Sequence, residues 1–232
     1  MIENRDKMAK VRDAAAYTLS EAAHYLRLPP ATLRSWVVGR KYPTAEGSRG
    51  FPPLIKPASA KPPMMSFTNL IEAHVLRALR TEHGVSVKAL RNALGYAQKA
   101  LGIERLLLSP ELRAEAGRVF LDRYGELIDL SASGQLALRK VLEKHLRRID
   151  WDETQIPIRL YPFLGGADGG DWRPIAIDPR ISFGRPVLSS KSISTAAIAD
   201  RIDSGETIAD IAADYDLDQS EVEEAVLYER AA

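Results

Sequence analysis

The sequence predicts a mainly α-helical protein with short β-hairpins, made of an N-terminal helical unit, an α+β middle segment and a C-terminal three-helix domain. Apolar residues recur at the 3.6-residue period of amphipathic helices in several separate stretches. Regions rich in Pro and Gly, at 39–63 and 165–171, interrupt these stretches. With 232 residues, of which 45% are apolar, the chain is long enough for two domains with cores of their own.

The N-terminal region predicts a tail followed by two short helices. Residues 1–16 are polar and then Ala-rich, without a sustained apolar stripe, so we expect a flexible tail. Thr18 and Glu21 have the spacing of a capping box ahead of a helix over 19–26, which a Leu-Pro-Pro sequence ends. A second helix is expected over 31–38. Its buried face carries Leu33, Trp36 and Val37.

A segment without helix follows, and then two longer helices. Nine Pro and Gly residues between positions 39 and 63 exclude helix there. Two short apolar pieces flank residues 56–61, which indicates a small hairpin with a basic tip. Amphipathic helices are expected over 70–80 and 86–101. We therefore place the first domain at residues 17–101.

Residues 102–164 are expected to form a strand-hairpin and helix segment. Apolar residues at helical period predict a helix over 133–149. The Gly-rich segment 165–171 resembles a phosphate-binding loop only superficially, because it lacks the lysine and the following helix of that motif, so we interpret it as a linker or loop. Short apolar runs between turn residues predict strands at 106–108, 119–121 and 127–130.

Residues 172–232 predict a small C-terminal helical domain. Two short strands precede a helix over 194–203. Two further capping-box spacings begin at Thr207 and Asp218, and each precedes apolar residues at helical period. We expect three packed helices at the end of the chain.

Charge is distributed unevenly, although the whole chain carries a formal charge of only +1. Residues 1–65 carry +6, residues 66–150 carry +4 and residues 151–232 carry −9. The basic front predicts contact with a polyanion, while the acidic rear contacts something else or screens the front. The alternative is two soluble surfaces that differ by chance.

The residue content also bears on compartment. The chain contains no Cys, which excludes disulfides, thiolate metal sites and Cys nucleophiles. The N-terminus is charged, and no stretch approaches the roughly 18 apolar residues that a membrane helix requires. We expect a cytoplasmic protein with no membrane association.

A short helix, a tight turn, a second helix with a buried Trp and a hairpin together describe a winged helix-turn-helix. Such a domain needs a rigid helix whose outer face enters a major groove about 12 Å wide, with basic elements beside it to hold phosphates. The alternative is an unrelated helical hairpin with solvated charges. The residues expected to contact DNA are Thr32, Arg34, Ser35, Arg40, Lys41, Tyr42, Arg49, Lys56 and Lys61.

At these residues the chain resembles a known family. The segments YTLSEAA at 17–23, ATLRSW at 31–36, SFTNLIEAHVL at 66–76 and GVS at 84–86 look like a MerR-type winged helix-turn-helix and its companion helices. The resemblance covers about residues 17–100. It implies a DNA-binding domain. A short recognition helix reads only a few base pairs and specific binding usually needs two half-sites, so we expect a homodimer.

A second resemblance lies in the C-terminal region. The segment IDPRISFGRPV at 177–187, with the downstream Gly205-Glu206-Thr207 and Asp214-Tyr215, is similar to a small helical family known mainly from antitoxins. Ser189-Ser190-Lys191 stands where that family commonly has Gly-Thr-Arg. Together the two domains resemble a VapB-type antitoxin. That resemblance implies a DNA operator and a ribonuclease toxin of the PIN-domain class as partners.

The last helix is unsuited to DNA. Residues 219–229 carry four carboxylates and no cation, which would repel phosphates. We assign this domain to protein contacts, either with itself or with a toxin; a solvated acidic face without a partner is the alternative. The candidate toxin-binding residues are Asp214, Asp216, Asp218, Glu221 and Glu224.

No constellation for catalysis is apparent. The four His residues lie in separate helical segments, none in an HExxH pattern, and no carboxylate pair stands beside a nucleophile. The sequence therefore predicts neither an enzyme nor a metal or cofactor site. The leading hypothesis is a DNA-binding antitoxin that represses its own operon. The alternatives are a MerR-like transcription regulator without a toxin, and a structural adaptor.

Overall fold

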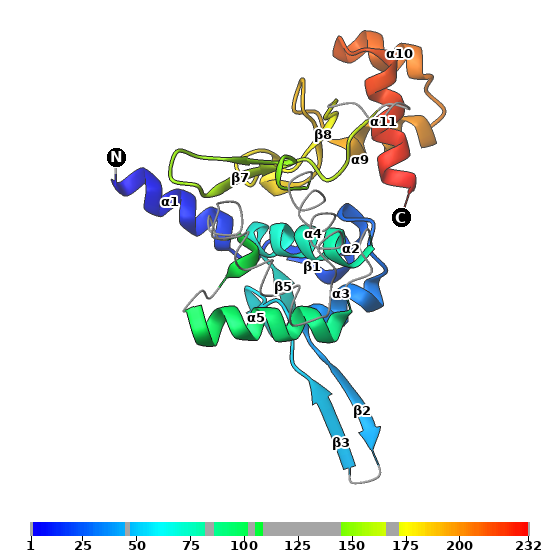
Figure 1. Cartoon of the computed structure of the whole chain (residues 1–232). Helices are drawn as coiled ribbons and strands as arrows, with labels where there is room; N and C mark the ends of the chain where they lie inside the picture. Colours follow the sequence, from blue (N-terminus) through cyan, green and yellow to red (C-terminus); the bar gives the residue numbers. More distant parts are fainter. Residues whose placement is uncertain are drawn as a thin grey trace, which may run out of the picture.

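The computed structural model describes residues 2–44, 47–81, 86–101, 105–108, 145–165 and 172–231. It consists of helices and small antiparallel sheets, in agreement with the predicted mixture. Figure 1 shows the helices of the C-terminal third at one end of the molecule and a two-stranded hairpin projecting from the other end.

The first residues differ from the predicted flexible tail, because Ile2–Asp13 form helix α1. The helix ends against the next domain: Thr68 Oγ1 donates a hydrogen bond to the Asp13 carboxylate, and Arg105 lies 3.6 Å from it. A missing apolar stripe did not exclude helix here, since the Lys, Arg, Glu, Met and Ala of this segment have high helix propensity.

The two predicted short helices are confirmed. Helix α2 (Leu19–Tyr25) begins with a complete capping box between Thr18 and Glu21. Helix α3 (Pro30–Val37) has Pro29 at its N-cap, so no side chain caps it. Leu33, Trp36 and Val37 are buried as predicted. The other face of α3 is thereby left outward.

A hairpin that the sequence did not predict follows α3. Strands β2 (Arg40–Thr44) and β3 (Gly47–Phe51) pair antiparallel from Arg40 opposite Phe51 to Thr44 opposite Gly47. Pro and Gly exclude a helix, but a two-stranded ribbon tolerates them because each strand has a free edge. Gly39 starts the hairpin at φ +83°, where an added Cβ would lie 2.5 Å from Phe51 O.

A small hairpin is present, but its first strand lies within the predicted tip at 56–61 and not at Leu54-Ile55. Strands β4 (Ser59–Ala60) and β5 (Pro63–Met65) pair antiparallel, and β1 (Tyr17–Thr18) adds to the other edge of β5. Helix α4 (Phe67–Thr81) follows and is buried along most of its length. Helix α5 (Val87–Leu101) follows and contributes the buried Leu90 to the same core as α4.

The middle segment departs from prediction where it is described. Leu106–Leu108 form the 3-10 helix η1 rather than a strand; Leu107 is buried in the main core, and so short an apolar run does not distinguish strand from helical turn. The helix predicted over 133–149 has ended before Ile149, which starts a strand. The predicted strands at 119–121 and 127–130 lie outside the described residues.

Two further hairpins join the middle segment to the C-terminal region. Strand β6 (Ile149–Trp151) pairs with β7 (Pro157–Leu160), and β8 (Ile175–Ala176) pairs with β9 (Val187–Leu188). Leu160 and Ile177 bridge the two hairpins and are buried in one core with α2, α3 and α4. Most of the segment 165–171 lies outside the described residues, but Gly165 N donates to Trp172 O at 2.9 Å, which brings its two ends together.

Three helices end the chain: α9 (Thr195–Asp203), α10 (Ile208–Tyr215) and α11 (Gln219–Arg230). The Thr207 hydroxyl accepts from the Asp210 N–H at the start of α10, and Asp218 with Glu221 forms a capping box at the start of α11. Their apolar faces surround a second core with β8 and β9. No described helix has both the length and the apolar character needed to cross a lipid bilayer.

Candidate nucleic-acid interface

Helix α3 presents a short polar face outward. Arg34 is exposed, whereas Thr32 and Ser35 are half-buried. The Ser35 hydroxyl donates to Thr32 O at 2.8 Å, so its hydrogen is committed within the helix while its oxygen can still accept. Val38, which is 47% exposed, extends this face at the C-terminal end. Arg34 is therefore the side chain on α3 that can reach farthest.

The hairpin β2–β3 places basic residues directly after this helix. Arg40 and Lys41 are exposed, and the backbones of Tyr42 and Arg49 lie opposite each other. Consecutive residues of a strand point to opposite faces, so Arg40 and Lys41 present charge on both faces of the ribbon. The hairpin projects away from the rest of the molecule (Figure 1).

The base of the hairpin is fixed to the helical core. Trp36 O accepts hydrogen bonds from Leu54 N at 2.7 Å and from Ile55 N at 3.0 Å, which ties the chain beyond β3 to the end of α3. On α5, Arg91 Nε donates to Pro52 O at 3.2 Å, and its guanidinium lies 4.7 Å from the Phe51 ring centre. The outward face of α3 and the hairpin therefore hold a set angle to each other.

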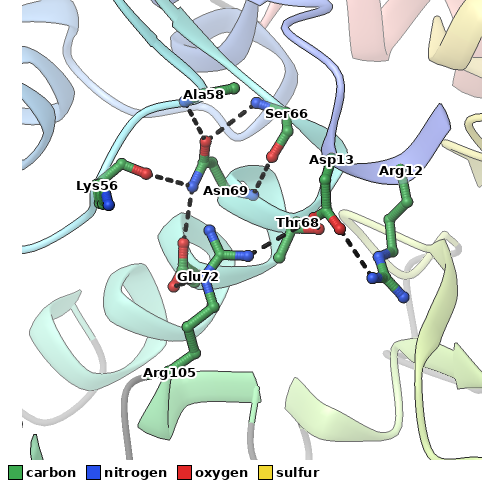
Figure 2. Close-up of polar contacts among 9 residues, drawn as sticks. All are labelled: Arg12, Asp13, Lys56, Ala58, Ser66, Thr68, Asn69, Glu72 and Arg105. Atoms are coloured by element: carbon green, nitrogen blue, oxygen red, sulfur yellow. Dashed lines mark hydrogen bonds and ion pairs between the residues drawn. The ribbon is translucent and has the colours of Figure 1, made fainter. Parts of the chain in front are cut away.

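The fully buried Asn69 organises the second basic loop (Figure 2). Its Oδ1 accepts from Ala58 N and Ser66 N, both at 3.1 Å, and its Nδ2 donates to Lys56 O and to Glu72 Oε2, both at 2.9 Å. Asn69 thus holds the backbone of Lys56 in place, while the Lys56 side chain stays exposed. Sequence analysis gave Asn69 no role; an Asn at the start of a helix, just after a Pro-rich loop, was the available signal.

Beside Asn69 lies a small network of charges. Burial raises the pKa of Glu72, while Arg105, 3.5 Å away, opposes the shift. Burial acts in the same direction on Asp13, but hydrogen bonds from Arg12 and Thr68 outweigh it and lower the pKa of that carboxyl. Arg105, the residue before η1, lies beside both carboxylates (Figure 2) and thereby connects the end of α1 to α4.

The C-terminal helix α11 contacts helix α2 of the helix-turn-helix. Tyr228 OH donates to Tyr25 O at 2.9 Å, and His24 Nε2 lies 3.0 Å from Glu229 Oε2. Arg27, in the turn between α2 and α3, has φ +48°, and its guanidinium lies 4.1 Å from the Phe163 ring centre. The turn that sets the angle between α2 and α3 therefore contacts the rear of the chain.

Beside this contact opens a cleft of about 700 Å³. Glu21, His24 and Arg27 line it from the helix-turn-helix, and Glu229 and Ala231 from the end of α11. The cleft thus borders the turn that leads into α3.

The predicted acidic site is engaged largely within the chain. Asp214 lies 2.5 Å from Arg201, and Asp216 lies 2.7 Å from Lys191. Asp218 and Glu221 cap α11, and Glu224 is half-buried on the same helix. Asp214 and Asp216 stay largely exposed, at 62% and 92% of their side-chain surface, so these two can still meet a partner.

Helix α2, the turn at Arg27 and helix α3 have the arrangement of a helix-turn-helix. Residues 15–94 match a family described as "Putative DNA-binding HTH domain", and residues 175–228 match "Protein of unknown function (DUF433)". The first match spans α2, α3, both N-terminal hairpins and α4.

Three proteins from Mycobacterium tuberculosis are similar to this chain. The chain is 28% identical to "Putative antitoxin VapB45", over 92% of this chain and 93% of that protein. It is 23% identical to "Uncharacterized protein Rv2308", over 93% of this chain and 90% of that one. The crystal structure of Rv2018 from the same organism superposes with a TM-score of 0.65 at 23% identity, covering 92% of this chain and 98% of the other. The last likeness concerns the fold alone.

Proposed function

We propose that this chain is a DNA-binding antitoxin of a type II toxin–antitoxin module, which represses its own operon and neutralises a ribonuclease toxin of the PIN-domain class. The observation that carries the proposal is the exposed Arg34 on α3 beside the projecting basic hairpin β2–β3. The similarity to a protein named as an antitoxin supports the second half of the proposal.

In the proposed complex, α3 enters the major groove and β2–β3 acts as the wing of a MerR-like domain. Arg34 reads a guanine edge or holds a phosphate, and Thr32 and Ser35 supply shorter polar contacts. Electrostatic attraction to the phosphates comes from the cations beside α3 and increases affinity irrespective of sequence. The residues proposed for these backbone contacts are Arg40, Lys41, Tyr42, Arg49, Lys56 and Lys61.

We further propose a homodimer, since one short recognition helix reads few base pairs and specific binding usually needs two half-sites. Because α4 is largely buried, α5 and the helix predicted over 133–149, most of which lies outside the described residues, are the remaining candidates for the interface. Light scattering at tens of micromolar is expected to give about twice the monomer mass of 25.6 kDa. A monomer in solution that also binds DNA with one copy per site would contradict this.

The toxin is proposed to meet the acidic rear of the chain. Ribonucleases must attract RNA, so their surroundings are commonly cationic, and residues 151–232 carry a net charge of −9 that steers such a protein toward them. The exposed Asp214 and Asp216, with Asp218, Glu221 and Glu224, are the candidate contacts.

Co-expression tests the antitoxin function. The product of the small gene adjacent to this one is expected to arrest growth alone, and the full-length chain is expected to restore growth and to co-purify with it. The Arg34→Ala variant should restore growth equally well, because neutralisation does not require the DNA-binding face. Failure of the intact chain to bind the product or to restore growth would reject the antitoxin function.

That failure would favour the second candidate, a MerR-like regulator without a toxin. The cleft beside His24 and Glu229 favours it, because a small ligand bound there would contact both the helix-turn-helix and α11. Such a ligand could alter the position of α3, and hence DNA affinity, through the turn at Arg27.

A further inference from the structure

The turn between β8 and β9 displays an aromatic side chain in a strained backbone. Phe183 is 92% exposed, and its φ and ψ are +55° and +29°; the preceding Ser182 has φ +49°. The left-handed region is unfavourable for residues other than Gly, and an exposed phenyl ring gains nothing from burial. Strained residues of this kind cluster at functional sites, so Phe183 is a candidate for contact with another molecule.

The backbone of this turn is fixed. Ile181 N donates to Asp178 O at 2.9 Å, Gly184 N to Ile181 O at 2.8 Å and Arg185 N to Ser182 O at 3.0 Å. Gly184 is buried, and a Cβ added to it would lie 2.1 Å from Tyr17 OH, so the turn is seated on the helix-turn-helix domain. The ring of Phe183 is therefore presented by a prearranged backbone, which lowers the entropy lost on binding.

The carboxylate of Asp178, which is fully buried, holds the start of the turn. It accepts hydrogen bonds from Arg180 N at 2.9 Å, Nε at 2.8 Å and Nη2 at 2.6 Å, and Arg159 Nη2 lies 3.3 Å away. Burial opposes ionisation of Asp178, but the hydrogen bonds from Arg180 outweigh it and lower its pKa. Arg180, three positions before Phe183, thereby keeps a fixed orientation with 42% of its side chain exposed, and Arg185, two positions after Phe183, is exposed as well.

The position of the turn separates it from the proposed DNA-binding face. β8, which precedes the turn, and α9, which follows β9, lie toward the end of the molecule opposite the projecting hairpin β2–β3 (Figure 1). A duplex held by that hairpin leaves this end free. An exposed aromatic ring beside arginines is typical of the residues that dominate protein–protein interfaces.

We propose that Phe183, flanked by Arg180 and Arg185, is the anchor by which this chain holds its protein toxin. The toxin presents an apolar pocket for the ring, with a carboxylate at its rim for Arg185. This inference rests on the proposed antitoxin function and adds a contact to it: the acidic residues of α10 and α11 steer the approach, and the ring at 183 fixes the complex.

The test uses the full-length chain and, as the probe, the tagged product of the adjacent small gene. Phe183→Ser is expected to weaken that complex at least about tenfold, chiefly by faster dissociation. Phe183→Gly should weaken it equally while leaving the melting temperature unchanged or higher, because Gly accepts φ +55° without strain. Val11→Ser is the control: Val11 is 39% exposed on α1, a helix assigned to neither the DNA nor the toxin, and its loss should leave the affinity unchanged.

Any one of five results would overturn the inference. Equal binding of the probe by wild type, Phe183→Ser and Phe183→Gly would show that the ring is no anchor. A melting temperature lowered by several degrees in Phe183→Gly would show a structural role instead. Equal losses in duplex DNA binding, or conversion of a dimer to a monomer, would assign the ring to DNA or to a second copy. If the wild-type chain does not bind the probe, both the proposed antitoxin function and the role of Phe183 are rejected.

Discussion

The Arg34→Ala variant is expected to bind the duplex upstream of the chain's own gene about 1–3 kcal/mol more weakly than wild type, if Arg34 reads a base. That range corresponds to roughly 5- to 150-fold in Kd. If Arg34 instead holds a phosphate, affinity should fall for all sequences and the slope of log K against log salt should decrease by about one. The exposed position of Arg34 on α3 is the physical reason.

A mobility-shift titration at several salt concentrations separates these two roles. Lys191→Ala is a charge-matched control, because Lys191 lies in the C-terminal region and pairs with Asp216. It removes one cation but should leave affinity and salt slope unchanged. Wild-type affinity in Arg34→Ala at every salt concentration would exclude Arg34 from the interface.

The Asn69→Ala variant is expected to lower the free energy of unfolding by about 2–3 kcal/mol. Four hydrogen bonds of the buried amide would be lost, and each buried polar group left without a partner costs about 1–3 kcal/mol. Water can reach the loop at the exposed Lys56 and Ala58, which limits the total. The loop that carries Lys56 and Lys61 should loosen as well, and DNA affinity should fall with it.

Denaturation with guanidinium chloride measures the free energy of unfolding that Asn69→Ala is expected to lose. Asn69→Asp should destabilise the fold by a similar amount, because it keeps the acceptor for Ala58 N and Ser66 N but places a second carboxylate beside Glu72. Ser189→Ala removes an exposed side-chain hydrogen bond to Arg173 O and should cost under about 0.5 kcal/mol. If Asn69→Ala lowered the free energy of unfolding by no more than Ser189→Ala does, the Asn69 amide would not organise the loop.

The sequence predicted the parts of the fold that depend on local signals. Helices α2 and α3 could be placed because Thr18 with Glu21, and the spacing of Leu33, Trp36 and Val37, act within a single turn or two of helix. The side chains at Thr207 and Asp218 likewise identified the starts of α10 and α11.

The remainder depends on contacts between residues distant in sequence. Tyr228 OH and Tyr25 O are 203 positions apart, and no pattern within either helix indicates that they meet. Asn69 likewise forms hydrogen bonds with backbone groups of Lys56 and Ala58, more than ten positions earlier in the chain. The hairpin β2–β3 was missed because its Pro and Gly content argues against helix and gives no strand period. The proposed DNA-contact residues were chosen on local grounds alone and stay predictions.

The contact between α11 and α2 has a consequence for the two proposed activities. A partner that pulls on α11 would act on Tyr25 through Tyr228 and on the α2–α3 turn through Arg27. Since α3 carries Arg34, the proposed toxin-binding and DNA-binding faces are joined by direct packing between the rear of the chain and the helix-turn-helix. Binding of either partner is thereby placed to change affinity for the other.

The wild-type arm of the Arg34 titration tests the central claim most directly. It measures the affinity of the full-length chain for the duplex upstream of its own gene and for a scrambled duplex of equal length and composition, at one stated salt concentration. The account predicts that the natural sequence binds at least about 10³-fold more tightly, as specific DNA-binding proteins do. Equal affinity for the two duplexes, or binding to neither, would contradict it.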